Sequence, residues 1–126
     1  MSHKNLKVAL IGNPNTGKTS VFNQLTGLKQ QVGNYPGITV EKKIGYCKLN
    51  ENTKATILDL PGTYSLNASS IDENVVIELL LNRNDPNFPG VAVVVTEVEN
   101  LKRNLLLFTQ IKDLEIPTIL AINMSD

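Results

Sequence analysis

Short apolar runs recur along the chain, and polar or turn-forming stretches separate them. Each run is rich in aliphatic and β-branched residues, a pattern that predicts buried strands. The predicted strands cover residues 6–11, 40–49, 55–60, 91–95 and 118–122.

Helix-length segments with apolar positions three or four residues apart lie between most of these runs. They cover residues 18–25, 71–81 and 101–114. This alternation of strand and helix predicts the α/β class with a mostly parallel sheet. The exception is the pair 40–49 and 55–60, because the polar turn between them is too short for a helix and the two strands should pair antiparallel. With the strands numbered along the chain, we expect the order 2-3-1-4-5 across the sheet.

Composition and charge narrow the class of protein. The 126 residues fit one domain, and 41% hydrophobic with 19% charged residues is ordinary for a soluble α/β protein. Twelve basic residues balance twelve acidic ones, so the net charge gives no basis for electrostatic capture of nucleic acid. The single cysteine, Cys47, cannot form an intrachain disulfide, and no apolar stretch approaches the roughly 18 residues of a membrane span. We therefore expect a soluble cytosolic domain.

The stretch GNPNTGKTS, residues 12–20, directly follows the first predicted strand and opens the first predicted helix. It matches the phosphate-binding pattern G-x-x-x-x-G-K-[ST], in the strand-to-helix context that this pattern requires. Backbone N–H groups, the helix N-terminus and the lysine charge can hold phosphate oxygens, and the threonine hydroxyl can bind Mg²⁺. The predicted phosphate site consists of Gly12, Asn13, Pro14, Asn15, Thr16, Gly17, Lys18, Thr19 and Ser20, with Thr19 at the metal.

Two further motifs follow other predicted strands. Asp59 and Gly62 form D-x-x-G, which can supply a carboxylate to Mg²⁺ and an N–H group to a γ-phosphate. Asn123 and Asp126 form N-x-x-D, whose carboxylate can accept two hydrogen bonds from guanine but not from adenine. Each tetrapeptide alone is typical of a simple turn. After a phosphate motif, the two together predict a site for GTP rather than ATP.

Residues 32–37 are rich in turn formers and predict a mobile loop before the second strand. Thr39, just after this loop, can close over the metal and the γ-phosphate with its hydroxyl and carbonyl groups. The plainer interpretation of Thr39 is a β-branched strand residue. We predict that Gly37, Ile38 and Thr39 contact the nucleotide and that Thr39 is also a Mg²⁺ ligand.

With these motifs placed, the whole chain resembles the N-terminal G domain of the ferrous iron transport protein B family. The marks of the resemblance are residues 12–19, 34–41, 59–66 and 100–105. The resemblance implies a P-loop NTPase fold with bound GTP or GDP. It also implies K⁺ held against the phosphates at Asn15, in the role of an arginine finger. In such a protein a helical regulatory domain and a transmembrane Fe²⁺ pathway would follow, at the cytoplasmic face of the bacterial inner membrane.

Thr63 follows D-x-x-G at the position where many GTPases place a glutamine that orients the attacking water. We therefore expect slow hydrolysis that relies on Lys18, on Mg²⁺, on groups near Thr39 and, by the resemblance, on K⁺ at Asn15. Against the resemblance, Glu97 stands where such domains often carry an aspartate.

The chain ends soon after its fifth predicted strand, and we expect residues 1–126 to lack the last strand, the second base-contacting loop and the final helix of a complete G domain. Residues 118–122 should then form an open apolar edge at which a second copy binds or the strand frays. Two other functions stay open. One is a nucleotide-binding interaction module with little turnover, and the other is a ribosome- or tRNA-associated GTPase, which the neutral charge disfavours.

Overall fold

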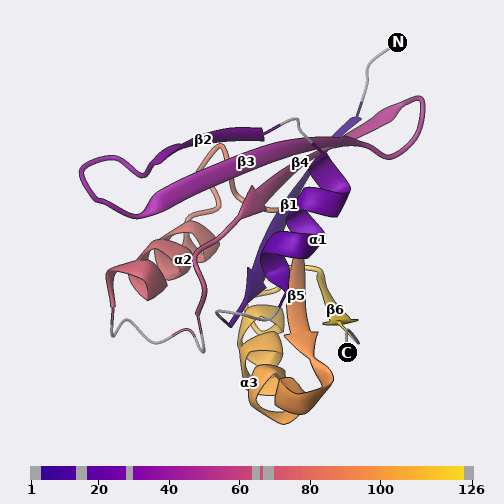
Figure 1. Cartoon of the computed structure of the whole chain (residues 1–126). Helices are drawn as coiled ribbons and strands as arrows, with labels where there is room; N and C mark the ends of the chain where they lie inside the picture. Colours follow the sequence, from indigo (N-terminus) through magenta and orange to yellow (C-terminus); the bar gives the residue numbers. More distant parts are fainter. Residues whose placement is uncertain (1–3, 14–16, 28–29, 64–65, 67–69, 124–126) are drawn as a thin grey trace.

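The computed structural model describes residues 4–13, 17–27, 30–63, 66 and 70–123 (Figure 1). This part of the chain forms six strands and three α-helices. In chain order they are β1 (Lys4–Gly12), α1 (Lys18–Thr26), β2 (Gln30–Asn34), β3 (Glu41–Lys48), β4 (Thr53–Asp59), α2 (Ile71–Leu81), β5 (Val91–Glu97), a 3-10 turn (Val98–Asn100), α3 (Leu101–Lys112) and β6 (Thr118–Asn123).

The six strands form one sheet in the order β2-β3-β4-β1-β5-β6. β1 pairs in parallel with β4 and β5, and β5 pairs in parallel with β6. β3 runs antiparallel to both of its neighbours, so it is the one reversed strand of this sheet in the described part of the chain. The predicted order and the predicted antiparallel strand are confirmed, with β2 added outside β3.

The prediction of a loop across residues 32–37 is wrong for its first half. Residues 32–34 belong to β2, which pairs with β3 from Gln30 opposite Gly45 to Asn34 opposite Glu41. Four of the five β2 residues are exposed, so the strand has no apolar alternation by which its sequence could reveal it. Its backbone hydrogen bonds to β3 hold it at the edge of the sheet. The mobility of the remaining turn stays a prediction.

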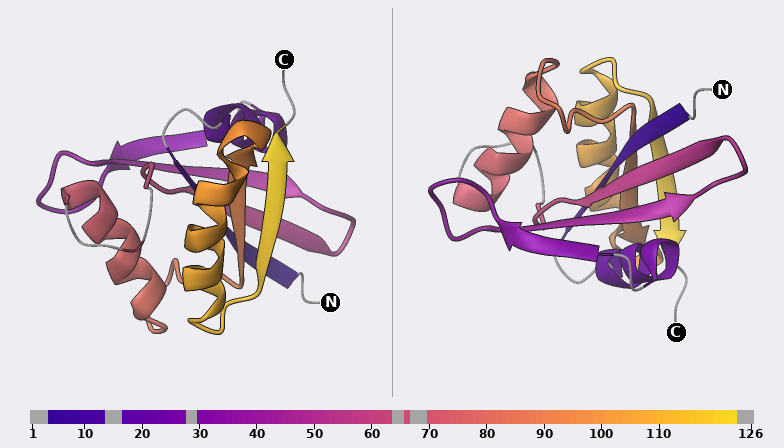
Figure 2. Two further views of the ribbon diagram at one scale, coloured as in Figure 1. Left: turned by 90° about the horizontal axis from the view of Figure 1, so that it is seen from below. Right: turned by 90° about the horizontal axis from the view of Figure 1, so that it is seen from above.

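Helices cover the two faces of the sheet (Figure 2). α1 contacts β1, β3 and β4, and its Phe22 packs with Leu10, Ala55 and Ile57 in a small buried cluster. The larger cluster lies on the other face, where Val76 of α2 and Leu107 of α3 pack over the inner strands. The first face is therefore held chiefly by one aromatic side chain.

Gly45 of β3 lets α1 approach the sheet closely. A Cβ atom at this position would lie 3.0 Å from Cζ of Phe22 and closer still to the Thr26 side chain. Any larger residue would push the helix away from β3.

The parallel strands β4, β1, β5 and β6 end at the same edge of the sheet. Gly12, Asp59, Glu97 and Asn123 are the last residues of these strands. In open α/β sheets, ligands bind in the crevice outside the carboxyl ends of the strands. The predicted motifs thus meet at one edge.

No helix among the described residues has the length and apolar character that crossing a membrane requires.

Candidate nucleotide-binding site

The first turn of α1 has the geometry that an anion-binding site needs. Gly17 caps the helix with φ 83°, a left-handed conformation that favours glycine, and as the N-cap residue it supplies no side-chain hydrogen bond. The first N–H groups of α1 and the positive end of its dipole are therefore directed at the crevice. Pro14, Asn15 and Thr16 of the predicted site lie outside the described residues.

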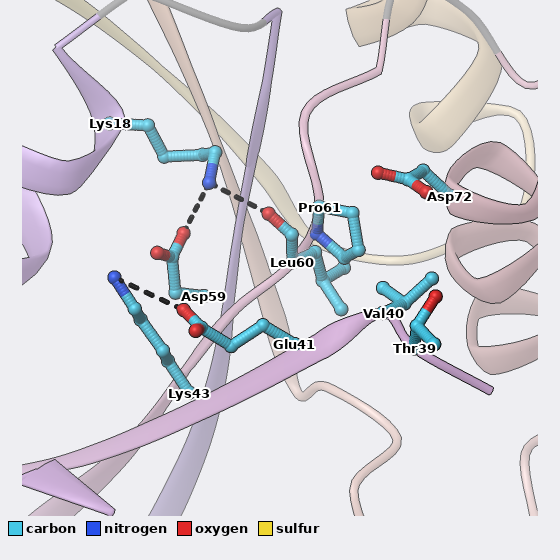
Figure 3. A pocket seen from close by; sticks show the side chains of 9 residues that line it. All are labelled: Lys18, Thr39, Val40, Glu41, Lys43, Asp59, Leu60, Pro61 and Asp72. Carbon is cyan, nitrogen blue, oxygen red and sulfur yellow. Dashed lines mark hydrogen bonds and ion pairs between the residues drawn. The ribbon is translucent and has the colours of Figure 1, made fainter. Parts of the chain in front are cut away.

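Lys18 joins the phosphate motif to D-x-x-G. Its ammonium group forms an ion pair with Asp59 and donates a second hydrogen bond of 2.7 Å to the Leu60 carbonyl (Figure 3). The Lys18 and Asp59 side chains are only 11% and 6% exposed. Charges this far from water are held together strongly, because each would be costly to leave alone.

The D-x-x-G segment is tied to β1. The Leu60 N–H group donates to the Leu10 carbonyl at 3.1 Å, and the Thr63 N–H group donates to the Gly12 carbonyl at 2.8 Å. These bonds hold residues 60–63 beside the start of the phosphate loop.

Thr63 is buried, and its hydroxyl donates a 3.2 Å hydrogen bond to the Glu73 carboxylate. Glu73 is also buried, and its own N–H group donates to the Ser70 hydroxyl at 3.1 Å. Ser70 is the N-cap of α2, and its hydroxyl donates in turn to the Glu73 carboxylate at 3.4 Å. Sequence reasoning missed Glu73, although Ser-x-x-Glu before an apolar helix is the signal that could have found it.

Thr39 lies in the turn that joins β2 to β3. The turn is closed by Tyr35 N–H donating to the Val40 carbonyl at 3.0 Å and by Ile38 N–H donating to the Tyr35 carbonyl at 3.2 Å. Thr39 lines the cavity that also contains Lys18 and Asp59, whose volume is about 280 Å³. Thr39 therefore faces the same cavity as Asp59 but lies at its opposite end (Figure 3). Gly37, with φ 77°, and Ile38 belong to the same turn and are not among the residues that line this cavity.

Tyr35 anchors this turn. Its hydroxyl is buried and has no hydrogen-bond partner among the described residues, and the Lys42 ammonium group lies 5.6 Å from the centre of its ring. Burial raises the pKa of the Tyr35 phenol to about 12, and the negative charges of Asp59 and Asp85 add to this effect. The phenol therefore stays neutral across the physiological range.

Six of the predicted nucleotide-binding residues line one cavity of about 430 Å³. Its lining consists of Asn13, Gly17, Lys18, Thr19, Ser20, Gly62 and Asp72. All of these except Asp72 were predicted from the sequence. Gly12, the last residue of β1, directly precedes Asn13 of this lining in the chain.

A third cavity, of about 480 Å³, lies between α1 and the ends of β5 and β6. Gly17 and Asn123 both line it. A Cβ atom at Gly17 would overlap the Asn123 side-chain amide, with Cγ at 3.3 Å, so only glycine allows this approach. Asn123 is thus placed beside Gly17, at the start of α1. Asp126 lies outside the described residues.

The residues present fit a nucleotide with Mg²⁺. Mg²⁺ is usually bound by one or two carboxylates together with phosphate oxygens and water. The site offers oxygen donors of this kind in Asp59 and Thr39, which share a cavity, and in Thr19 at the helix start. Among the described residues no group of three or more His, Cys, Asp or Glu could hold a metal ion by itself. The donor set therefore suits a metal that arrives with phosphates.

The sheet order, the glycine-capped helix after β1 and the lysine that meets Asp59 define a P-loop NTPase of the G-domain type. The family model described as "Ferrous iron transport protein B" matches residues 6–126. The chain belongs to this family.

Curated relatives agree with this assignment. The chain is 44% identical over 127 aligned residues to the Fe(2+) transporter FeoB of Escherichia coli (strain K12) and, to the same extent, to that of Shigella flexneri. Each alignment covers 98% of this chain and 16% of the relative. The chain thus spans about one sixth of the length of these relatives.

Solved structures of FeoB domains share the fold. The G domain of T. maritima FeoB superimposes with a TM-score of 0.85 at 44% identity, covering 94% of this chain and 71% of that one. A GDP-bound mutant of the S. thermophilus domain gives a TM-score of 0.82 at 44% identity, covering 96% and 44%. The cytosolic domain of L. pneumophila FeoB gives 0.84 at 43% identity, covering 93% and 45%.

Proposed function

We propose that this domain binds GTP and GDP and hydrolyses GTP slowly, as the regulatory domain of a bacterial ferrous iron transporter. The contact between Lys18 and Asp59 carries the proposal, because it joins the lysine predicted to bind phosphate and the carboxylate predicted to bind Mg²⁺ in one cavity. The GDP-bound structure of the S. thermophilus relative supports the choice of nucleotide.

Thr19, Thr39 and Asp59 would hold Mg²⁺, which supplies charge neutralisation at the phosphates when it is bound. Lys18 would leave Asp59 and turn to the β- and γ-phosphates. The N–H groups at the start of α1 would cradle the same oxygens. Leu60 and Thr63 are bonded to β1, and Gly62, which lies between them in the chain, would present its N–H group to a γ-phosphate.

Base selection would come from the third cavity. Asn123 would hold the phosphate loop in place, and Asp126 would pair with guanine. Asp126→Asn should relax the preference for guanine over xanthine nucleotides, and an unchanged preference would contradict this role.

Hydrolysis is proposed to be slow because the Thr63 hydroxyl is bonded to Glu73 and does not replace a water-orienting glutamine. Asn15 would hold K⁺ as the second cation. Comparing GTP turnover in K⁺ and Na⁺ tests this part of the proposal, and equal rates would refute it.

The absence of a water-orienting glutamine at Thr63 also favours a second candidate function, an interaction module that holds GDP with little turnover. Measuring phosphate release from GTP distinguishes the slow GTPase from the interaction module. A module without turnover would release phosphate no faster than GTP does in the absence of protein.

In a full-length transporter this domain would lie at the cytoplasmic face of the inner membrane. Its partners would be a helical regulatory domain and a transmembrane Fe²⁺ pathway, and nucleic acid would not be one of them. The turn at residues 35–40 would respond to the γ-phosphate through Thr39. Hydrogen exchange across residues 33–40 with GDP and with a GTP analogue tests this response, and identical exchange would contradict it.

A further inference from the structure

Asp59 has two lysines near it, Lys18 and Lys43, and the proposed nucleotide site uses only Lys18. Lys18 of α1 forms an ion pair with it. Lys43 of β3 stands directly opposite Asp59 in the antiparallel pairing of β3 with β4. Both lysines line the same cavity, and Figure 3 shows their ammonium groups reaching it from two different elements.

Lys43 has a weak partner in this structure. Its ammonium group lies 3.5 Å from Oε1 of Glu41, and the two side chains are 29% and 57% exposed. Ion pairs this close to water contribute little, because solvent screens them and two long side chains must be ordered. Lys43 can therefore exchange Glu41 for another carboxylate at low cost.

Asp59 needs such an exchange when phosphates bind. If Lys18 turns to the phosphates, a carboxylate that is only 6% exposed loses its cation. Mg²⁺ can replace that cation. Without Mg²⁺, the side chain directly across the β3–β4 ladder is close enough to do so, since opposite residues on one face of an antiparallel pair are neighbours.

We propose that Lys43 is a positioning residue that serves as the counter-ion of Asp59 in the Mg²⁺-free, GDP-bound state. The proposal rests on the proposed function, because it needs GDP to draw Lys18 away. Lys43 leaves Glu41 and pairs with Asp59 when Lys18 leaves, and it returns when Mg²⁺ occupies the site. The domain then holds GDP without a strict requirement for Mg²⁺.

The test is the affinity for GDP, measured by calorimetry on the folded protein in EDTA and again in excess Mg²⁺. Lys43→Gln should weaken GDP binding in EDTA by about fivefold, which corresponds to about 1 kcal/mol. In Mg²⁺ the same variant should bind GDP as the wild type does. A purely structural role would weaken binding in both buffers.

Lys42→Gln is the matched control, because Lys42 is the neighbouring lysine on β3 and lies over Tyr35 instead of beside Asp59. It should leave GDP affinity unchanged in both buffers. Glu41→Gln should act in the opposite direction to Lys43→Gln and tighten GDP binding in EDTA, because it frees Lys43. Lys43→Arg keeps the charge and should retain wild-type affinity, which guards against a variant that merely folds poorly.

Equal GDP affinity of Lys43→Gln and wild type in EDTA, with normal binding in both, would overturn the role of Lys43 alone. A wild type that binds no GDP in either buffer would overturn the proposed function as well.

Discussion

Lys18 and Asp59, 41 positions apart in the chain, form a buried ion pair across the mouth of the candidate site. The pair links the helix that follows β1 to the end of β4. It also brings the Lys18 ammonium group and the Asp59 carboxylate into direct contact, whereas a bound phosphate and metal would draw them apart. In the nucleotide-free domain, the residues that the ligand would use therefore neutralise each other.

Lys18→Ala should lower both nucleotide affinity and the stability of the free domain. Removing the lysine takes its cation from Asp59, and pairing with Lys43 recovers only part of the loss. The net cost should be about 1 to 2 kcal/mol in the free energy of unfolding. Urea denaturation without nucleotide measures this loss. Lys18→Ala combined with Asp59→Asn should lose less than the sum of the two single variants. Additive losses would show that the pair contributes nothing, and unchanged GDP affinity in a folded Lys18→Ala variant would refute the phosphate site.

Gly45→Ala should destabilise the domain by about 1 to 3 kcal/mol, because the added methyl group meets the Thr26 and Phe22 side chains of α1. Gly33→Ala is the matched control in the neighbouring strand β2, where an added Cβ has nothing within 4 Å. Thermal unfolding of the two variants should differ accordingly. Equal midpoints would mean that α1 can move from β3 without loss.

Tyr35→Phe should change how stability depends on pH. The pKa of this phenol is raised from 10.0 to about 12 in the folded domain, chiefly by burial. As the pH rises, the unfolded chain therefore loses the phenol proton before the folded domain does. The contribution of the phenol to the free energy of unfolding is complete below pH 10 and is lost as the pH rises to about 12.

The variant lacks this titration, so its free energy of unfolding should fall less than that of the wild type between pH 10 and 12. The difference should be about 1 kcal/mol for a partly exposed group. Below the range it should be as stable as the wild type or slightly more so, because a buried hydroxyl without a partner among the described residues is removed. Denaturation curves at stepped pH measure both effects. Parallel declines of variant and wild type would contradict the buried state of the phenol.

Much of the fold could be predicted because apolar residues recur at different spacings in helices and in strands. α2 begins and ends at the predicted residues, 71 and 81, since its apolar spacing is bounded by a capping serine and by Asn82. β2 could not be predicted, because a mostly exposed edge strand is held by backbone bonds to β3 and carries no apolar alternation.

The candidate site divides in the same way. Lys18, Thr19, Asp59 and Asn123 follow strands in short motifs, so local sequence predicts them. Glu73 and Lys43 act through partners that the fold supplies. Glu73 reaches Thr63 only because residues 60–63 are bonded to β1, and Lys43 stands opposite Asp59 only through the register of β3 with β4. No local pattern encodes these pairings.

The last prediction concerns the edge of the sheet at β6. This strand pairs with β5 on one side, and two of its apolar side chains, Ile119 and Ile122, are 56% and 45% exposed. An edge strand with open hydrogen-bonding groups and exposed apolar residues can pair with another chain. We expect the domain to self-associate through β6 in solution.

Ile119→Lys should reduce this association, because a charge on an edge strand opposes pairing with a second copy. Val32→Lys is the matched control, since Val32 is 60% exposed on β2 at the opposite edge. Light scattering as a function of concentration should show a smaller average mass for Ile119→Lys than for Val32→Lys or the wild type. Hydrogen exchange should in parallel become faster at residues 119–122 in the Ile119 variant, because a pairing partner is lost. A wild type that stays monomeric with fully protected amides at residues 119–122 would show that β6 is not an open edge in solution. Equal association of the two variants would show that the contact lies elsewhere on the domain.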